Sequence, residues 1–113
     1  MSCIFCRIVN KEIPANKVYE DDRVFAFHDI NPQAPYHLLV IPKKHISTLL
    51  ELTEEDKGLI GHIYGVINKI AEDLGFAERG FRVVVNCKEE AGQTVFHVHF
   101  HVLAGRPMEW PPG

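Results

Sequence analysis

The sequence has no long apolar run. Its longest apolar stretches are only a few residues long, such as residues 38–41, whereas a helix that crosses a bilayer needs roughly 20. No basic region followed by an apolar core stands at the start of the chain, as it would in a secretory signal. We therefore expect a cytoplasmic protein with no membrane partner.

Concentrated positive charge is also lacking. The 113 residues hold 12 Lys and Arg against 15 Asp and Glu, a formal net charge of −3 with no basic block. Proteins that bind a nucleic-acid polymer carry a basic patch, so no such partner is expected. Three cysteines are an odd number, which argues against a secreted disulfide framework. Repeats and linkers are absent too, and the length suits a single domain over residues 1–113.

The hydrophobic pattern predicts short strands and one long helix. Alternation, turn residues and prolines predict strands at 18–20, 23–28, 37–41, 81–86 and 95–103, with a polar loop at 87–94 and a short helix or turn at 3–9. Helical spacing predicts a helix over 54–74 with a core-facing stripe of Leu59, Ile63, Val66, Ile67, Ile70 and Leu74. Gly61 and Gly65 inside it indicate close packing or a subunit contact. The fold class is therefore α+β, a largely antiparallel sheet of about five strands with one long helix.

What the sequence does have is histidine. Three of its seven histidines alternate with apolar residues, namely His97, His99 and His101. Residues two apart in a strand share a face, so these rings should point to one side. Two chemistries fit, a zinc or copper site and nucleophilic or general acid–base catalysis on an anionic substrate such as a phosphate. His28 and His62 have no such company and are expected to be ordinary strand and helix residues.

Two more patterns leave alternatives open. Phe27 and Asp29 share one face of a predicted strand, which suits a ring wall beside a carboxylate that accepts from ribose hydroxyls; a core ring and a turn residue are the alternatives. Cys3-x-x-Cys6 is half of a zinc motif, and a pair of buried thiols is its alternative.

The pattern His-φ-His-φ-His-φ-φ, where φ is apolar, resembles the signature of the histidine triad (HIT) family of nucleotide hydrolases and transferases. The resemblance extends over residues 21–23, 26–30, 33–35, 37–46, 84–86 and 92–93 and to the final Trp-Pro-Pro-Gly. With this ending, the chain is similar to the Hint-type nucleoside phosphoramidase branch. The resemblance implies a HIT-like fold.

The same resemblance implies a mechanism. His99 would be the nucleophile that attacks the α-phosphorus of a purine nucleoside 5′-phosphoramidate, such as lysyl adenylate, and forms a nucleotidyl-histidine intermediate. Its other ring N–H then needs an acceptor that holds the tautomer. His37, His97 and His101 would share phosphate binding and proton relay, and catalysis would require no cofactor.

The resemblance also implies a nucleotide site. It assigns the base to Ile4, Phe5, Ile8, Phe27 and Ile30, the ribose to Asp29, and the phosphate region to Asn86, Gly92, Gln93 and Thr94. Trp110 would shape the leaving-group side of a partner's site in a homodimer.

Some relatives in the wider superfamily complete a zinc site, and the matching residues here are Cys3, Cys6, His45 and His97. Such a Zn²⁺ ion would be structural, and His97 as its ligand could not relay protons.

The chain departs from the family pattern in its loop 87–91, which is less glycine-rich, and at Thr94, where serine is common. Glu89 and Glu90 in this loop would favour a lysyl amine as leaving group. Two other functions remain open: a dinucleoside polyphosphate hydrolase, and a nucleotide-binding or zinc-stabilised interaction module with incidental turnover.

Overall fold

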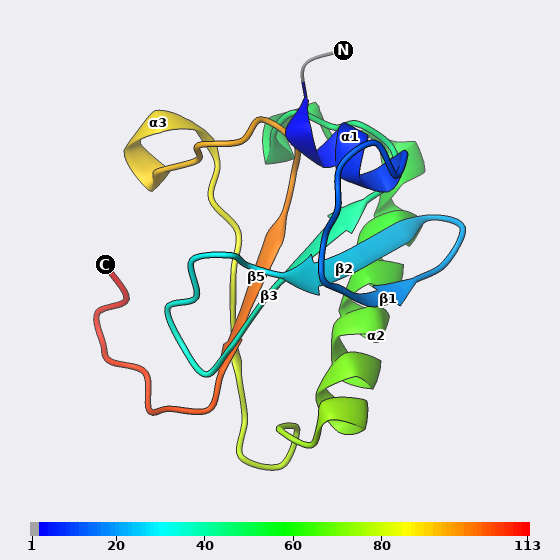
Figure 1. Ribbon diagram of the computed structural model, residues 1–113. Coiled ribbons are helices and arrows are strands. Elements are labelled where there is room, and N and C mark those ends of the chain that lie inside the picture. Colours follow the sequence, from blue (N-terminus) through cyan, green and yellow to red (C-terminus); the bar gives the residue numbers. More distant parts are fainter. Residues whose placement is uncertain (1–2) are drawn as a thin grey trace.

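A five-stranded antiparallel sheet forms the centre of the computed structural model, which describes residues 3–113. Its strand order is β1-β2-β3-β5-β4, and every neighbouring pair is antiparallel. The strands are β1 (Lys17–Glu20), β2 (Val24–His28), β3 (Tyr36–Pro42), β4 (Arg82–Val84) and β5 (Phe100–Ala104) (Figure 1). The predicted α+β class with one long helix is confirmed.

The long helix α2 (Lys57–Leu74) follows two short 3₁₀ turns, η1 (Leu49–Glu51) and η2 (Glu54–Asp56). Thr53 and Asp56 form a reciprocal capping box, which satisfies donors that no helical carbonyl can reach. The α-helix predicted over 54–74 therefore begins later than expected, because its first turn is a 3₁₀ turn. Gly75 ends α2 with φ +87°, a left-handed conformation that glycine adopts without strain. Within residues 3–113, no helix is long and apolar enough to cross a membrane.

Strand alternation gives the sheet two different faces. One face packs against α2 through a large core that includes Val24, Leu38 and Phe100. The other face carries a smaller cluster in which Phe5 and Ile8 of the short helix α1 (Ile4–Val9) cover four strand residues, Phe25, Phe27, Leu39 and Ile41. Figure 1 shows α1 at one end of the sheet and α2 running along it. The predicted site residues Phe5, Ile8 and Phe27 therefore lie on the α1 face.

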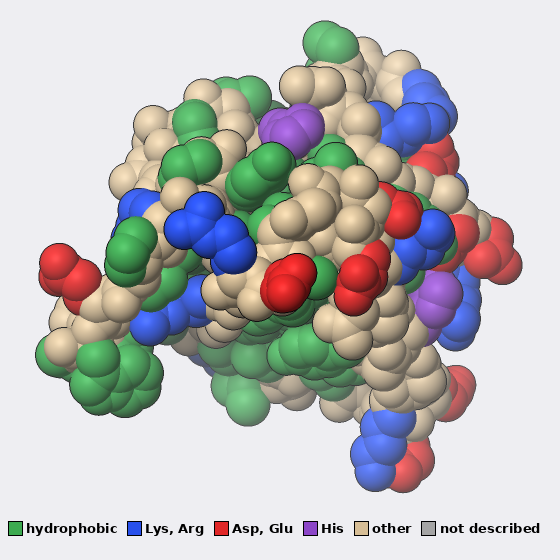
Figure 2. All heavy atoms as spheres, turned by 90° about the horizontal axis from the view of Figure 1, so that it is seen from below, with side chains coloured by type: hydrophobic (Ala, Val, Ile, Leu, Met, Phe, Trp, Pro, Cys, Tyr) green, Lys and Arg blue, Asp and Glu red, His purple; other side chains and the backbone are tan. Residues whose placement is uncertain are grey.

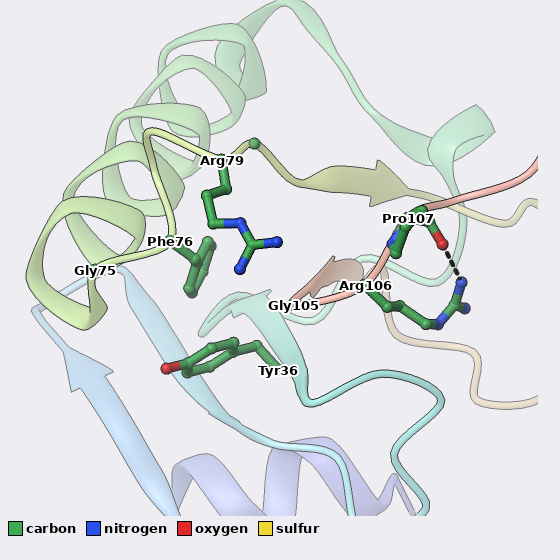
Figure 3. Close-up of a pocket in the computed structure, with 8 residues that line it drawn as sticks. Tyr36, Gly75, Phe76, Arg79, Gly105, Arg106 and Pro107 are labelled. Carbon is green, nitrogen blue, oxygen red and sulfur yellow. Dashed lines mark hydrogen bonds between the residues drawn. The ribbon is translucent and has the colours of Figure 1, made fainter.

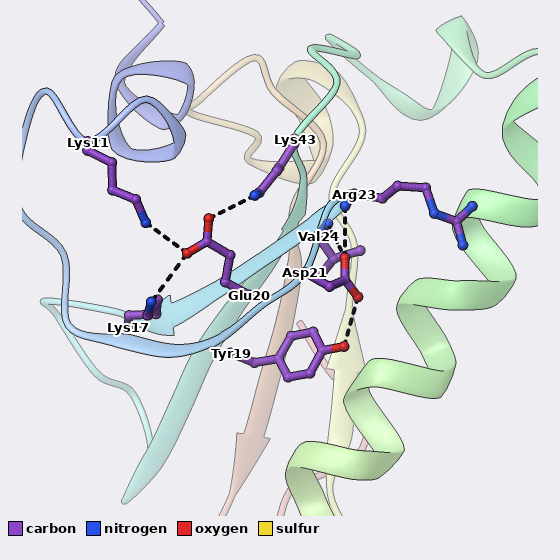
Figure 4. Close-up of polar contacts among 8 residues, drawn as sticks. All are labelled: Lys11, Lys17, Tyr19, Glu20, Asp21, Arg23, Val24 and Lys43. Carbon is purple, nitrogen blue, oxygen red and sulfur yellow. Dashed lines mark hydrogen bonds and ion pairs between the residues drawn. The ribbon is translucent and has the colours of Figure 1, made fainter.

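An ion-pair network holds the first hairpin. Glu20 lies 2.8 Å from Lys11, 3.3 Å from Lys17 and 2.7 Å from Lys43 (Figure 4). Beside it, Asp21 accepts hydrogen bonds from the backbone of the turn and from the Tyr19 hydroxyl. The His62 ring also lies 2.6 Å from Asp21. These contacts tie α2 and the segment that follows α1 to the hairpin, and they give His62 a structural role.

The last predicted strand is too long. The ladder of β5 begins at Phe100, which pairs with Val40, although the alternation predicted a strand from residue 95. The ladder begins no earlier because the neighbouring strand β3 ends at Pro42, which has no N–H for a ladder hydrogen bond. Val98 instead donates its N–H to the Ile46 carbonyl, at 2.7 Å. His97 and His99 consequently lie just before the sheet ladder.

Other boundaries are corrected by local contacts. The predicted strand 81–86 pairs only as Arg82–Val84, and the predicted loop 87–94 contains a one-turn helix, α3 (Lys88–Ala91). Leu74, predicted as core, is 37% exposed, because it lies at the last turn of α2. A side chain at Gly61 or Gly65 would meet nothing within 4 Å, so neither glycine serves close packing between residues 3–113.

Candidate active site

His99 presents a bare ring nitrogen. Its Nδ1–H donates to the His97 carbonyl at 2.7 Å, so the neutral ring carries no proton on Nε2. Burial lowers the pKa of His99 below its ordinary value, which keeps the ring neutral at pH 7. His99 therefore has the acceptor that a nucleophilic histidine requires, and Nε2 is free to attack.

A chain of hydrogen bonds fixes the tautomers of two further histidines. The Gln33 backbone N–H donates to His37 Nδ1 at 3.0 Å, so the single proton of neutral His37 lies on Nε2. His37 Nε2 is 2.9 Å from His101 Nδ1 and must be the donor. The proton of His101 consequently lies on Nε2. Burial, followed by the charges of His99 and His37, lowers the pKa of His101 to about 4, so this ring is a neutral hydrogen-bond donor.

The same cluster has the composition of a metal site. Atoms of Asp29, His37 and His101 lie within 4.8 Å of one another, and Asp29 Oδ2 is 3.4 Å from His37 Nε2. A metal ligand must offer a lone pair. His37 offers none, because Nδ1 accepts from Gln33 and Nε2 carries the proton. The cluster is therefore a hydrogen-bonded relay and does not suit a metal ion.

A cavity of about 340 Å³ opens beside the two rings of His99 and His101, a size within the range of small-molecule sites. Nine of the predicted site residues line it: Ile4, Phe5, Ile8, Phe27, Asp29, Ile30, Thr94, His99 and His101. Sequence reasoning missed four more lining residues, Ile13, Pro14, Leu39 and Val95. Leu39 could have been found, since it alternates with His37 along one strand. Val95 could have been found too, since it alternates with the triad histidines in the predicted strand 95–103, whereas Ile13 and Pro14 lie in an irregular segment that no periodicity predicts.

Phe5 packs against His99 and Phe27. Its ring packs edge-on against His99 at 5.1 Å and against Phe27 at 5.7 Å between centroids. The remaining polar groups of the cavity are few. Asp29 accepts the Asn31 N–H with Oδ1 at 2.8 Å, which holds its side chain at the edge of the cavity. The walls are thus apolar, with one carboxylate, one hydroxyl (Thr94) and two imidazoles.

Four predicted nucleotide-binding residues do not line this cavity. Gln93 is occupied, because its Nε2 donates to the carbonyls of Ser47 (2.8 Å) and Val95 (3.1 Å) while its Oε1 accepts the Lys88 N–H. Gly92 ends α3 with φ +86°. Asn86 lies between β4 and α3, and Trp110 lies in the tail with 82% of its surface exposed. Neither lines the cavity within one chain.

The structure brings Cys3, Cys6, His45 and His97 together, with one ligand atom of each inside 4.8 Å. His97 Nδ1 lies 3.4 Å from Cys3 Sγ, 3.6 Å from Cys6 Sγ and 3.3 Å from His45 Nδ1. Tetrahedral zinc, with bonds of about 2.0 Å to nitrogen and 2.3 Å to sulfur, places such pairs about 3.3–3.6 Å apart. The four residues therefore fit a zinc ion.

The surroundings of His97 also suit a metal ligand. Its Nε2 donates to the Pro42 carbonyl at 2.7 Å, which leaves the Nδ1 lone pair facing the two thiols and His45. The ring is fully buried. Both nitrogens are thus engaged away from the cavity, so the geometry gives His97 no place in the predicted proton relay. Its backbone carbonyl, however, orients His99.

Comparison with protein families decides the assignment. Residues 10–108 match the model of the HIT domain. The chain belongs to the HIT domain family. An uncharacterized HIT-like protein of Synechocystis sp. is 53% identical over 110 residues, which are 97% of this HIT chain and 96% of that protein.

Solved HIT structures agree closely with this one. A HIT family hydrolase from Legionella pneumophila is 48% identical, with a TM-score of 0.97 over 99% of this HIT chain and 100% of that chain. A histidine triad nucleotide-binding protein from Candida albicans is 34% identical, with a TM-score of 0.83 over 97% and 83% of the two chains. The HIT fold predicted from the triad is confirmed.

Proposed function

We propose that this HIT protein hydrolyses the P–N bond of purine nucleoside 5′-phosphoramidates through a nucleotidyl-His99 intermediate. The observation that carries the proposal is the bare Nε2 of His99 in the wall of a cavity of about 340 Å³. The relatives named as a hydrolase and as a nucleotide-binding protein support the substrate class. The Trp-Pro-Pro-Gly ending favours the phosphoramidase branch.

The reaction consumes one water in two steps. In the first, the Nε2 lone pair of His99 forms a bond to phosphorus, the P–N bond breaks, and the amine leaves with a proton taken from solvent. In the second, water attacks phosphorus, releases a proton and frees His99 with its lone pair restored. His101 Nε2–H donates to a phosphoryl oxygen as negative charge grows there. A neutral imidazole is suited to this role because it needs no proton transfer.

The cavity favours a single purine nucleoside. The apolar side chains of its wall, including Ile4, Phe5 and Phe27, offer stacking area and no hydrogen-bonding group for the edge of a base. Such a wall prefers the larger ring system without distinguishing adenine from guanine. Asp29 would accept from the ribose hydroxyls. A volume near the lower end for small-molecule sites favours this substrate over a dinucleoside polyphosphate.

Rapid-quench mass spectrometry with adenosine 5′-phosphoramidate tests the proposal. A nucleotidyl adduct is expected on His99 in the wild type, with no adduct and no turnover in His99→Ala. His28→Gln is the matched control, because His28 does not line the cavity. It should form the adduct as the wild type does. Turnover by His99→Ala at the wild-type rate, or faster cleavage of diadenosine polyphosphate than of the phosphoramidate, would contradict the proposal.

We also propose a structural Zn²⁺ ion at Cys3, Cys6, His45 and His97. When bound, the ion would tie the start of α1 to the segment before β5, which stabilises the fold without entering the reaction. Metal analysis of wild type against Cys6→Ser tests it. About one zinc per chain is expected in the wild type and none in the variant. Cys87→Ser is the matched control, since Cys87 lies outside the cluster.

A homodimer is proposed for the same protein. Trp110 is exposed and does not line the cavity of its own chain, and β4 is an edge strand whose outer side has no partner among the described strands. A second copy would cover these surfaces and bring Trp110 towards a neighbouring site. Light scattering should therefore give twice the mass of one chain.

A further inference from the structure

The backbone of Gln33 forms hydrogen bonds on two sides. Its N–H donates to His37 Nδ1 at 3.0 Å, and its carbonyl accepts a hydrogen bond from Arg106 Nε at 3.0 Å. The two contacts lie on the same residue of the loop between β2 and β3. One end of Gln33 therefore faces the relay of His37 and His101, and the other faces the segment that follows β5.

That segment is closely fitted to the loop. Gly105 has φ +97°, and a Cβ at this position would lie 2.8 Å from Pro35 Cβ. Arg106 follows directly, and its guanidinium also donates through Nη1 to the Pro107 carbonyl at 3.0 Å (Figure 3). With the Pro107 carbonyl accepting from its guanidinium, Arg106 presents Nε to Gln33 in one orientation.

Figure 2, which views the molecule from below, shows basic and acidic side chains interspersed and no continuous basic surface on this face.

Arg106 shares its surroundings with a second arginine. A cavity at this end of the molecule is lined by Tyr36, Phe76, Arg79 and Arg106 among others, and Figure 3 shows the Arg79 side chain reaching over Phe76. Among residues 3–113, no carboxylate lies within ion-pair distance of either guanidinium, since neither arginine occurs in an ion pair. Only Arg106 contacts the carbonyl of Gln33.

We propose that Arg106 is a positioning residue that favours the proton of His37 on Nε2 by holding the backbone of Gln33, whose N–H contacts this ring. The inference rests on the proposed function, because the relay matters only if His101 donates to a substrate phosphate. Arg106 is linked to His101 through three contacts: Arg106 to the Gln33 carbonyl, the Gln33 N–H to His37, and His37 to His101.

The other tautomer of His37 explains why this contact matters. A proton on His37 Nδ1 would face the Gln33 N–H, two donors head to head at 3.0 Å. His37 Nε2 would then be an acceptor, so His101 would carry its proton on Nδ1 and turn a lone pair towards the cavity. A lone pair repels a phosphoryl oxygen, whereas an N–H binds it. The Gln33 N–H, together with the Asp29 carboxylate 3.4 Å from His37 Nε2, therefore favours the tautomer in which His101 attracts the substrate.

Nitrogen-15 NMR of the histidine rings tests the proposal without any substrate. In the wild type, His37 and His101 should each show a protonated Nε2 and an unprotonated Nδ1. Arg106→Ala should move both rings towards a mixture of tautomers, and Arg106→Lys, which keeps one donor, should restore part of the wild-type spectrum. Arg79→Ala is the matched control and should leave both rings unchanged. Wild-type tautomers in Arg106→Ala would overturn the proposal.

Turnover of adenosine 5′-phosphoramidate gives the second readout. Arg106→Ala should lower kcat/KM by about 2- to 10-fold, the factor that one net hydrogen bond represents, and Arg79→Ala should not change it. Equal losses in the two variants would overturn the positioning role. Failure of the wild type to cleave the phosphoramidate would instead refute the proposed function, while the NMR result would still judge the contact between Arg106, Gln33 and His37.

Discussion

Acid should destabilise this protein through His101 in particular. Its Nδ1 accepts from His37 at 2.9 Å, so a second proton there would place two donors face to face. Burial and the neighbouring histidines lower its pKa from 6.5 to about 4. The folded state therefore binds this proton less readily than the unfolded chain. The resulting stabilisation is complete above pH 6.5 and is lost as the pH falls towards 4.

The magnitude follows from the two pKa values. A difference from 6.5 to about 4 corresponds to about 3 kcal/mol when fully expressed. At pH 5, where the unfolded ring is mostly protonated and the folded ring is not, about 2 kcal/mol of the free energy of unfolding is already lost. His101→Gln removes the titrating ring and keeps a side chain that can form hydrogen bonds.

Urea unfolding near pH 7.5 and near pH 5, in wild type and His101→Gln, measures this difference. The wild type should lose about 2 kcal/mol more than the variant on acidification. Groups other than His101 are present in both proteins, so their contribution to the pH dependence cancels in the comparison. Equal pH dependence in the two proteins, within about 0.5 kcal/mol, would show that burial and the neighbouring histidines do not lower the pKa of His101.

Three further predictions concern the walls and supports of the site. Phe5→Ala should lower the free energy of unfolding by about 3–5 kcal/mol, because it leaves a cavity where a buried ring was. Phe5→Leu should lower this free energy much less. Equal losses in the two variants, measured by urea unfolding, would contradict the packing argument. The kcat/KM of the wild type should be about tenfold higher for adenosine than for 2′-deoxyadenosine phosphoramidate. Asp29→Asn should reduce this ratio of kcat/KM values. An unchanged ratio would exclude Asp29 as the acceptor of the ribose hydroxyls. Glu20→Gln should lower the free energy of unfolding by about 1 kcal/mol at low salt. The loss should be smaller at high salt, because salt screens the three partly exposed ion pairs of Glu20 with lysines. A loss that does not depend on salt would show that charge is not the cause.

Local pattern was sufficient for the fold and for much of the site. Alternation along the strands assigned Phe27 and Asp29 to the face that α1 covers, and the spacing of the triad put its rings on the same side. Boundaries were harder, because a strand exists only where a neighbour can pair with it. The alternation of residues 95–99 satisfies the rule for a strand, yet the end of β3 at Pro42 leaves these residues without a ladder.

Hydrogen-bond partners far apart in the chain could not be predicted. The side chain of Gln93 is of a type that binds phosphate, but the structure uses all its polar atoms on backbone groups. The tautomer of His37 depends on the backbone N–H of Gln33, which every residue except proline has, so no side-chain pattern announces it. The same holds for the acceptor of His99, a backbone carbonyl two residues away.

The short helix α1 is the helical cover of the candidate site, and its few buried side chains affect how the protein unfolds. Helix α1 has six residues and buries only Phe5 and Ile8, whereas α2 anchors the opposite face through a stripe of buried side chains. Partial openings of low free energy occur where few apolar contacts hold an element. In hydrogen exchange, α1 should therefore exchange its amides well before β3 and α2. Under mild heat the protein should lose its candidate site while most of its sheet remains folded, so loss of activity should precede the loss of secondary structure.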